Sequence, residues 1–280
     1  MARGKVLTFG FSPCPNDTFQ FYALVHGKID TGGLAFEPVL ADVEELNRLA
    51  LDAKLDVTKV SSGALARLSR DYWCLKSGGA LGRGAGPLWV ARGGTSAESA
   101  AENPIAHPGI HTTAHLLLSL RLGNRFTGAP MIFSDIMDAV LSGRAASGVI
   151  IHEGRFTYGD RGLTLLEDLG LWWEREIGLP IPLGNILLKR GTPGVDPPRM
   201  DALLKKSLLY ARENPSEVMP WVREHAQEMS EDVMAKHIAL YVNDASLDIG
   251  PEGEAAVREL LKRRSALPGA EPAAGELFWK

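Results

Sequence analysis

The sequence predicts an α/β protein built as two lobes. Strand-like and helix-like segments alternate along most of the chain, which is typical of crossover units around a sheet with helices on both faces. The chain has 280 residues, whereas single cores stop growing near about 250 residues and domains cluster around about 100 to 150. Two stretches rich in small residues or proline interrupt the alternation, and these indicate crossings between the lobes.

The first α/β series begins near the N-terminus. Residues 5–10 read as a strand, and a rigid turn with two prolines follows it. A helix over residues 18–27 is expected to end on Gly27, at the place of a left-handed C-cap. The remaining strands and helices of this series are expected at residues 34–40, 43–54, 56–60 and 61–70.

A glycine-rich loop, residues 78–86, leads into a strand at 87–92. Because it precedes a strand and fails the P-loop spacing, it does not predict a nucleotide site; it either brings backbone amides near a ligand or only links two elements. Small polar residues at 93–103 then mark a first crossing, and the prolines of LPIPLGN mark a second. We therefore expect a larger lobe from residues 1–92 and 186–280 and a smaller lobe from residues 93–185.

Beyond residue 196 the chain is predicted to be helical. Four segments each open on Ser, Asp, Pro or acidic residues, which are typical helix-start signals. We expect these helices to return and cover the first lobe. The last dozen residues, rich in Ala, Pro and Gly, predict a loosely packed tail.

Composition excludes several classes of protein. The net charge is -4 and no basic cluster is interleaved with aromatic residues, so nucleic acid is not an expected partner. No apolar run approaches the roughly 18 residues of a membrane span, and the N-terminus lacks an apolar signal region, so we expect a cytoplasmic protein without membrane insertion. Cys14 and Cys74 have neither the spacing nor the number for a disulfide framework or a zinc site, and both are expected to be small buried groups.

Two segments correspond to each other without a gap. LNRLALDAKLDVTKVSS and IMDAVLSGRAASGVIIH each read as a helix, a short basic turn, a buried strand and a polar residue where the strand ends. In this correspondence Ser62 falls opposite His152. Ligands of open α/β sheets bind beyond the carboxyl ends of strands, so the two lobes are expected to present Ser61, Ser62 and His152 to one cleft.

His152 is the candidate for acid–base chemistry. An imidazole at a strand end suits proton transfer near neutral pH, although a structural or exposed histidine explains its position equally well. Glu153 and Arg155 follow it and either orient it, hold a substrate acid, or pair with each other. The sequence has no Gly-x-Ser-x-Gly elbow, no cysteine with a recognisable partner and no kinase signature, so covalent catalysis is not expected.

Other polar residues are candidates for binding an anion. Thr112 and Thr113 stand at a predicted helix start, where free amides and the helix dipole favour negative charge, although an N-cap explains one threonine. Lys59 with Ser61 and Ser62 offers a charge and hydroxyl donors, although a lysine there is often simply solvated. Asn16 and Asp17, together with Ser12 and Thr18, either cap the first helix or form a wall of the cleft. His111 and His115 are spaced to share a metal, but no third ligand accompanies them, so no metal site is expected.

Taken together, several segments resemble the 1,4-dihydroxy-6-naphthoate synthases of the futalosine route to menaquinone. GFSPCPNDTFQFYALVHGKID, TKVSSGAL, SGGALGRGAGPL, HTTAHLLL, GVIIHEGRFTY and LPIPLGNI lie in that family's order, and the stretch containing HIALYVNDASLDIG also resembles it. The resemblance therefore covers nearly the whole chain. His115 and Asn185 depart from the family's pattern, and both are expected to adjust the cleft lining.

The resemblance implies a fold like that of the type II periplasmic binding proteins, with a mixed sheet flanked by helices in each lobe. It implies a lyase that breaks cyclic dehypoxanthine futalosine into 1,4-dihydroxy-6-naphthoate and a sugar-derived fragment, without metal or organic cofactor. His152 would be the proton acceptor. The residues implied to bind the anionic small-molecule substrate are Lys59, Val60, Ser61, Thr113 and Ala114, with Thr112 as their neighbour.

Three alternatives share this fold. Chorismate dehydratase belongs to the same pathway, but the His-Glu-Gly-Arg-Phe-Thr-Tyr segment and the Ser-Pro-Cys-Pro-Asn-Asp opening favour the synthase. A solute-binding protein would need a signal peptide, and a transcriptional regulator would need a DNA-binding domain, for which there is no room before residue 5. Fold alone decides none of these, because function depends on the site. The sequence does not give the oligomeric state.

Overall fold

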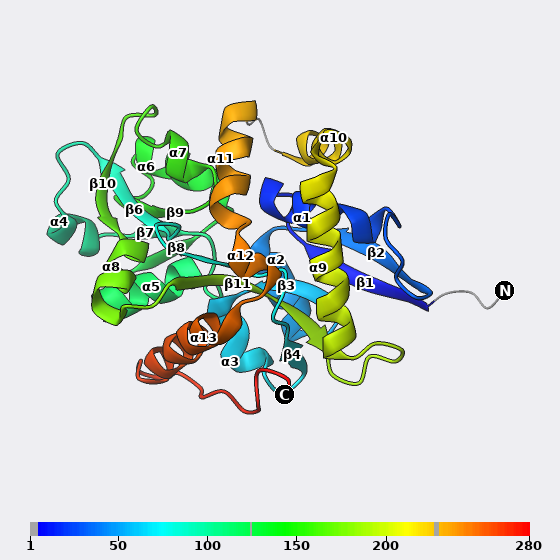
Figure 1. The fold of residues 1–280 in the computed structure, drawn as a ribbon. Helices are drawn as coiled ribbons and strands as arrows, with labels where there is room; N and C mark the ends of the chain where they lie inside the picture. The colour runs from blue at the N-terminus through cyan, green and yellow to red at the C-terminus, as the bar shows by residue number, and fades with distance from the viewer. Residues whose placement is uncertain (1–4, 124, 227–229) are drawn as a thin grey trace.

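The protein folds into two mixed β-sheets with helices packed around them (Figure 1). The computed structural model describes residues 5–123, 125–226 and 230–280. The predicted α/β class is confirmed, and so is the presence of a mixed sheet in each half of the molecule. Among the described residues, no helix is both long enough and apolar enough to cross a membrane.

The first sheet has a central parallel part and an antiparallel side. Its strand order is β2 (Leu34–Leu40), β1 (Lys5–Phe11), β3 (Val57–Ser61), β11 (Ile181–Lys189) and β4 (Tyr72–Cys74), and β5 (Ala80–Gly82) also pairs with β11. Strand β1 is parallel to β2 and β3, whereas β11 is antiparallel to β3, β4 and β5. Parallel β1 and β3 therefore end on the same edge of the sheet.

The second sheet repeats this mixture. Its order is β10 (Leu163–Asp168), β6 (Leu88–Arg92), β9 (Ser147–Ile150), β7 (Ile105–His107) and β8 (Gly128–Pro130). Strand β7 is parallel to β8 and β9, and β6 is antiparallel to β9 and β10. The predicted strand before His152 is thus the central strand of this sheet.

Aromatic side chains fill the core beneath the first sheet. Phe9 and Phe11 of β1 are fully buried, and the ring of Phe9 lies 4.9 Å from that of Phe21 in α1 (Pro15–Val25). Helix α1 begins on a proline, and after it Gly27 adopts the left-handed conformation that the sequence predicted, with φ of 62°. The rigid Ser-Pro-Cys-Pro turn therefore joins a buried strand to a buried helix.

The other helices up to residue 180 connect consecutive strands. In the first half they are α2 (Val43–Leu51), the short 3-10 turn η1 (Ser62–Ala64) and α3 (Leu65–Leu68). In the second half they are α4 (Ala97–Ala101), α5 (Thr113–Leu122), η2 (Phe133–Asp135), α6 (Ile136–Leu141), α7 (Gly154–Thr157) and α8 (Leu169–Ile177).

The chain passes from one sheet to the other at different residues from the lobe boundaries that the sequence predicted. Strand β6 pairs with β9 and β10, so residues 88–92 belong to the second sheet and not to the first. The small polar stretch at 93–103 contains α4, and β11 of the first sheet already starts at Ile181. We propose that the crossings between the lobes run through residues 83–87 and 169–180.

The two crossings contact each other through a pair of glycines. A Cβ atom placed on Gly86 would lie 2.2 Å from the Cα of Gly170, so only two glycines allow this approach. Leu169 donates its backbone N–H to the carbonyl of Pro87 at 3.0 Å beside this contact. Arg155 links the first crossing to the start of the second. It donates to the carbonyl of Gly86 at 2.6 Å and to the carboxylate of Asp168, which directly precedes the second crossing, at 2.7 Å.

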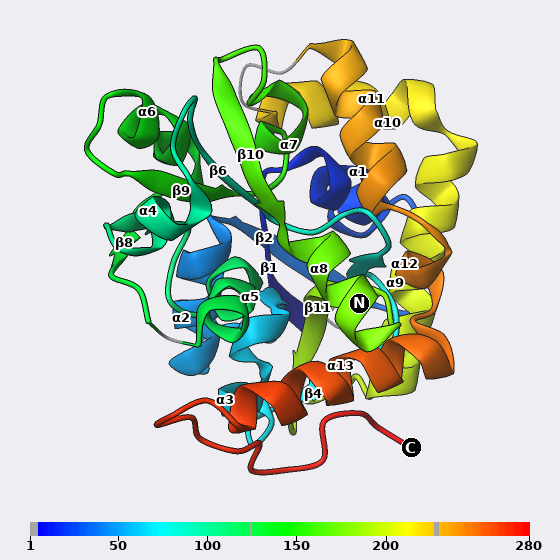
Figure 2. The same ribbon diagram turned by 90° about the vertical axis from the view of Figure 1, so that its left-hand side faces the viewer.

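The predicted C-terminal helices are α9 (Pro197–Glu213), α10 (Pro215–His225), α11 (Glu231–Tyr241), the short α12 (Asp244–Leu247) and α13 (Gly250–Ser265). Helices α9, α10 and α11 pack on α1, as expected for a return to the first lobe. Helix α13 runs below the first sheet and contacts η1, β11 and also α5 of the second half (Figure 2). It therefore touches elements of both sheets.

The prediction of a loosely packed tail is wrong for the last residues of the chain. Leu277 and Phe278 are buried in the core cluster of the first sheet, and Phe278 forms a parallel bridge to Cys74. The Trp279 indole donates to Asp201 at 2.8 Å. Low apolar content over the last dozen residues predicted exposure, but three consecutive large apolar side chains suffice to anchor the segment.

Candidate active site

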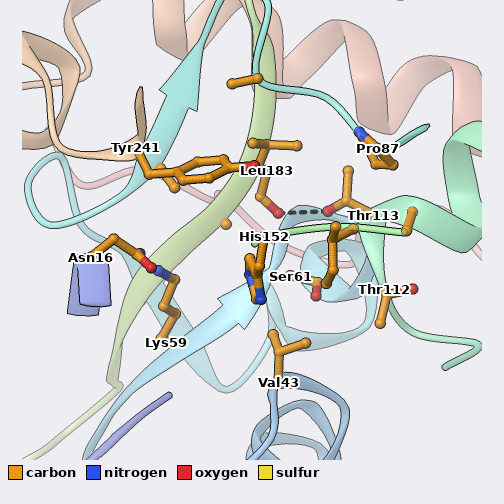
Figure 3. A pocket seen from close by; sticks show the side chains of 15 residues that line it. Asn16, Val43, Lys59, Ser61, Pro87, Thr112, Thr113, His152, Leu183 and Tyr241 are labelled. Carbon is orange, nitrogen blue, oxygen red and sulfur yellow. Dashed lines mark hydrogen bonds between the residues drawn. The ribbon is translucent and has the colours of Figure 1, made fainter. Parts of the chain in front are cut away.

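A cavity of about 60 Å³ lies where β3 of the first sheet and β9 of the second both end (Figure 3). Most of the predicted site residues line it, and they come from α1, β3, α5 and the segment after β9. The predicted residues that line it are Asn16, Lys59, Ser61, Thr112, Thr113, Ala114 and His152. The structure thus brings the two corresponding strand ends together, as the sequence predicted.

Lys59 and Asp17 form a buried ion pair at this cavity. The Lys59 ammonium donates to Oδ1 of Asp17, and the side chains are 8% and 0% exposed. The same carboxylate accepts from Ser12 Oγ at 2.7 Å and from Asn16 Nδ2 at 2.7 Å. Asp17 therefore does not line the cavity itself but fixes Lys59 and Asn16, which do.

The residues after Lys59 alternate between the cavity and the core. Ser61 lines the cavity, and its hydroxyl and backbone N–H both bond to Asn47, at 3.3 and 2.9 Å. Val60 points the other way and is buried in the apolar cluster, so its side chain does not line this cavity, and its assignment to the substrate site stays a prediction. Ser62 also lies outside the cavity, because its hydroxyl accepts from Asn185 at 2.7 Å. Asn185 is accordingly a buried structural residue and not part of the cleft lining.

The start of α5 presents backbone amides at the cavity. Thr112 is the N-cap, and its hydroxyl accepts from the N–H of His115 at 3.2 Å. The Thr113 hydroxyl donates to the Leu183 carbonyl at 2.6 Å and accepts from the N–H of Gly63 at 3.2 Å. Neither threonine hydroxyl is free, so an anion here would meet chiefly the first N–H groups of the helix, those of Thr113 and Ala114.

His152 projects into the cavity from a strained backbone. Its φ is 53°, in the left-handed region, directly after the end of β9. Among the described residues the only hydrogen-bond contact of the imidazole is from Nδ1 to the Cys14 sulfur, at 3.4 Å. The ring also lies edge-on to Phe133, with centroids 5.3 Å apart. Nε2 of His152 therefore has no hydrogen-bond partner among the described residues.

The surroundings of His152 favour its neutral form. Its pKa is lowered to about 4, chiefly by burial and then by the Lys59 ammonium, while the Asp17 carboxylate opposes the change. Burial also raises the pKa of the Cys14 thiol, so this partner is an uncharged thiol. At neutral pH the imidazole is consequently an uncharged proton acceptor.

Sequence reasoning missed two residues on α11. His237 is fully buried, and its ring centroid lies 5.5 Å from that of His152. Tyr241 lines the cavity one turn later on the same helix. Their spacing of four on a predicted helix placed them on one face, but nothing in the sequence indicated that this face meets His152.

The tautomer of His237 follows from its neighbours. Asn16 donates its amide nitrogen to Asp17, so its oxygen faces His237 and accepts from Nε2 at 3.1 Å. Nδ1 of His237 then carries no proton, and it is buried with no partner among the described residues. The pKa of His237 is well below its usual value because of burial, His152 and Lys59. The site therefore holds a second uncharged imidazole with a bare acceptor nitrogen.

Glu153 and Arg155 do not pair with each other. Arg155 instead forms the ion pair with Asp168 that ties the two crossings, so it neither orients His152 nor holds a substrate acid. Glu153 faces a different hollow, beside Met137 and Thr157, and one of its oxygens is buried without a hydrogen-bond partner among the described residues.

His111 and His115 do not converge as a pair of metal ligands. The ring of His115 lies tilted against that of His107, with centroids 4.5 Å apart, whereas His111 contacts Arg67. Within the described parts of the chain, no three His, Cys, Asp or Glu side chains gather closely enough to hold a metal ion.

Comparison with known proteins decides the family. Residues 7–266 match the family described as menaquinone biosynthesis. A 1,4-dihydroxy-6-naphthoate synthase of Thermus thermophilus is 46% identical over 274 residues, covering 98% of this chain and 99% of the relative. The chain belongs to the 1,4-dihydroxy-6-naphthoate synthase family. A second synthase, from Streptomyces coelicolor, is 42% identical over 96% of both chains. The predicted resemblance to this family of enzymes is therefore confirmed.

Solved structures confirm the predicted fold type. A protein of Archaeoglobus fulgidus, 34% identical to this synthase-family chain, superimposes with a TM-score of 0.87 over 93% of this chain and 97% of its own. An alkanesulfonate-binding protein of Xanthomonas axonopodis, only 14% identical, has a TM-score of 0.68 over 98% of both chains. The latter likeness shows the periplasmic-binding-protein type of fold and nothing about ligands.

Proposed function

We propose that this protein is a lyase that converts cyclic dehypoxanthine futalosine to 1,4-dihydroxy-6-naphthoate, with His152 as the general base. Membership of the synthase family supports the reaction, since two relatives of nearly full length bear that name. The observation that carries the role of His152 is its uncharged imidazole in the cavity, which has a single hydrogen-bonding contact to the described residues. A neutral imidazole with a free nitrogen is a competent proton acceptor.

The contact with Cys14 orients the base. We assign the imidazole proton to Nδ1, which donates to the neutral Cys14 sulfur at 3.4 Å. This tautomer leaves the lone pair of Nε2 for the substrate. Removal of a substrate proton by Nε2 would start the fragmentation, and formation of an aromatic product favours its completion.

The opposite wall would hold the anionic oxygens of the substrate. The free N–H groups of Thr113 and Ala114 stand at the positive end of the ten-residue helix α5. Lys59 adds an ammonium whose charge is shared with Asp17, and Ser61 adds a hydroxyl. Donors fixed before the reaction stabilise charge that develops during it.

His237 supplies a second acceptor. The Asn16–Asp17 network holds its ring through Nε2, the ring centroid lies 5.5 Å from that of His152, and Nδ1 is buried without a partner among the described residues. A substrate hydroxyl that donates to this nitrogen would satisfy a buried group that is otherwise unpaired. His237 therefore favours a substrate with a hydroxyl group next to the atom that loses its proton.

Turnover with defined substrates tests this function. We expect the purified protein to form 1,4-dihydroxy-6-naphthoate from cyclic dehypoxanthine futalosine, followed by absorbance and mass, and to leave chorismate unchanged. His152→Ala should lower kcat by about 100-fold or more, which is the scale of a general base. His225→Ala, a histidine on α10 outside the cavity, serves as the control and should stay within a few-fold of the wild type.

Three results would contradict the proposal. Binding of the futalosine derivative without turnover would indicate a solute-binding protein. Dehydration of chorismate would indicate the sister enzyme. Equal turnover by the wild type and His152→Ala would keep the reaction and assign the base to another residue.

A further inference from the structure

A second cavity lies on the other side of α5 from the active site. Its volume is 230 Å³, and it is lined by residues of η1, α3, α5, α13 and the turn after α13. The polar side chains around it are those of Arg67, His111, His115, Ser119 and Arg264. None of its lining residues is acidic.

Two arginines at this cavity lack a carboxylate partner. Arg264 is buried, at 8% exposure, and its hydrogen bond runs from Nη1 to the backbone carbonyl of Glu271 at 2.6 Å. Arg67 contacts only His111, from Nη1 to Nδ1 at 3.4 Å. Across the described residues, neither guanidinium forms an ion pair with an acid, whereas most other arginines do. A buried cation without a counter-ion is unfavourable, so the Arg264 guanidinium favours a bound anion, and the exposed Arg67 adds a second positive charge at the same cavity.

Ser119 provides an independent observation. Its residue is 2% exposed, and its buried hydroxyl has no hydrogen-bond partner among the described residues, although the residue lines the cavity. Buried hydroxyls are normally paired, so this one needs an acceptor that the protein does not supply. An oxyanion next to the two arginines is such an acceptor.

The histidines respond to the same positive field. His111 Nδ1 accepts from Arg67, so its proton is on Nε2 and the ring is neutral. Burial lowers the pKa of His111, and the positive charges of Arg67, Arg48 and Arg264 lower it further. Arg48 lies outside the cavity and pairs with Glu44, whose carboxylate also accepts from the N–H of His111 at 3.2 Å. The two arginines that line the cavity, Arg67 and Arg264, therefore supply its positive charge, and none of its lining residues is acidic.

We propose that this cavity binds a phosphate group, either free or carried by a small metabolite. Phosphate is matched by paired arginines because a guanidinium donates two parallel hydrogen bonds to its oxygens. The Ser119 hydroxyl and His111 Nε2 add neutral donors. This proposal is independent of the reaction proposed for the first cavity.

The position of the second cavity links it to the active site. Arg67 and Arg264 belong to elements of the first lobe, whereas His111 and Ser119 belong to the second-lobe segment that carries α5. Gly63 lines the second cavity and donates to Thr113, whose side chain lines the first. A bound phosphate would hold α5 against α3 and α13, and so fix the helix start that faces the substrate.

Calorimetric titration with inorganic phosphate at constant ionic strength tests the site. Arg67→Gln should weaken phosphate binding by about tenfold, as expected for loss of a charged hydrogen bond, and Ser119→Ala by a few-fold. Arg70→Gln, an exposed arginine that does not line the cavity, is the matched control and should bind like the wild type. A parallel titration with glycerol phosphate separates a free ion from a phosphate ester, according to which of the two binds more tightly.

The proposal fails if the wild type binds neither probe at millimolar concentration. It also fails if Arg67→Gln and Ser119→Ala bind phosphate as tightly as Arg70→Gln does, because phosphate would then occupy another site. Arg67 is exposed, so its replacement leaves folding intact and a loss of binding is attributable to the site.

Discussion

The units α2–β3 and α6–β9 have the same local structure but different surroundings at their ends. Each is a helix followed by a tight turn and a buried strand, and each turn contains a left-handed residue, Ala53 with φ of 52° and Gly143 with φ of 78°. These two residues occupy equivalent places in the correspondence between the two segments. Ser61 at the end of β3 and His152 after β9 meet at the active-site cavity.

The two strand ends differ in how far their polar groups are satisfied. After β3 every candidate is engaged, since Lys59 pairs with Asp17, Ser61 with Asn47 and Ser62 with Asn185. After β9 the imidazole of His152 contacts only a weakly polar sulfur and has a strained backbone. Protein partners hold Lys59 and Ser61 in fixed positions, from which their remaining N–H and O–H donors can face a substrate, whereas the imidazole of His152 keeps a nitrogen without a partner among the described residues. Four predictions test this contrast.

The largest effect is expected at the buried ion pair of Lys59 and Asp17. Asp17→Asn would leave the buried ammonium of Lys59 without its counter-ion, which costs about 3–5 kcal/mol. Asp52→Asn is the control, because Asp52 pairs with Lys54 on the surface at 2.9 Å and exposed pairs contribute about 1 kcal/mol or less. Urea denaturation measures both. Similar losses for the two variants would mean that the buried pair is no more important than the surface one.

The second effect is a loss of folding stability in acid that originates at His152. The pKa of His152 is about 4 in the folded protein and 6.5 in an unfolded chain, so the unfolded state takes up the proton first. The stabilisation is complete above pH 6.5 and is lost as the pH falls from there through 4, by about 3 kcal/mol. His152→Asn should flatten the curve of unfolding free energy in this range. Parallel curves for the two proteins would contradict the lowered pKa.

The third effect tests whether His237 of α11 binds the substrate through its Nδ1 atom. His237→Phe removes the bare Nδ1 and should lower kcat/KM by about tenfold, corresponding to one hydrogen bond to substrate. His237→Gln retains a donor for the Asn16 oxygen and separates the structural contact from the acceptor. If both variants melt early but turn over normally when folded, His237 is only structural.

The smallest effect concerns backbone strain. A non-glycine residue in the left-handed region costs about 1 kcal/mol, and His152 adopts it. His152→Gly should therefore be more stable than His152→Ala by about 1 kcal/mol, although both are inactive. Equal stability in urea would show that the strain is absent at this position.

The sequence predicted local features better than long-range ones. Alternation of elements gave the fold class, and the gapless correspondence correctly brought Ser61 and His152 to one cavity. Strand pairing could not be predicted in this way, because the sequence of residues 88–92 is compatible with a strand in either sheet. Only their pairing with β9 assigns them to the second sheet. The side-chain direction of Val60 follows from strand alternation, but the resemblance treated residues 59–61 as one binding segment.

Contacts between distant segments limited the prediction of the site. Tyr241 reaches the cavity, and His237 reaches the ring of His152, because α11 packs on α1, far away in sequence. Cys14 was correctly predicted to be buried, but its contact with His152 depends on the approach of the two lobes. Arg155 follows His152 closely in the sequence and was a natural candidate for its partner, yet it pairs with Asp168.

The glycine pair at the crossings has a consequence for how such chains diverge. Because Gly86 and Gly170 touch backbone to backbone, a methyl group on either one would push the two crossings apart. Each position therefore restricts the other: a homologous chain that acquires a side chain at one of them must reshape the opposite crossing as well. Sequences of the family should thus keep glycine at both positions together or change both together, as a coupled pair within otherwise variable connections.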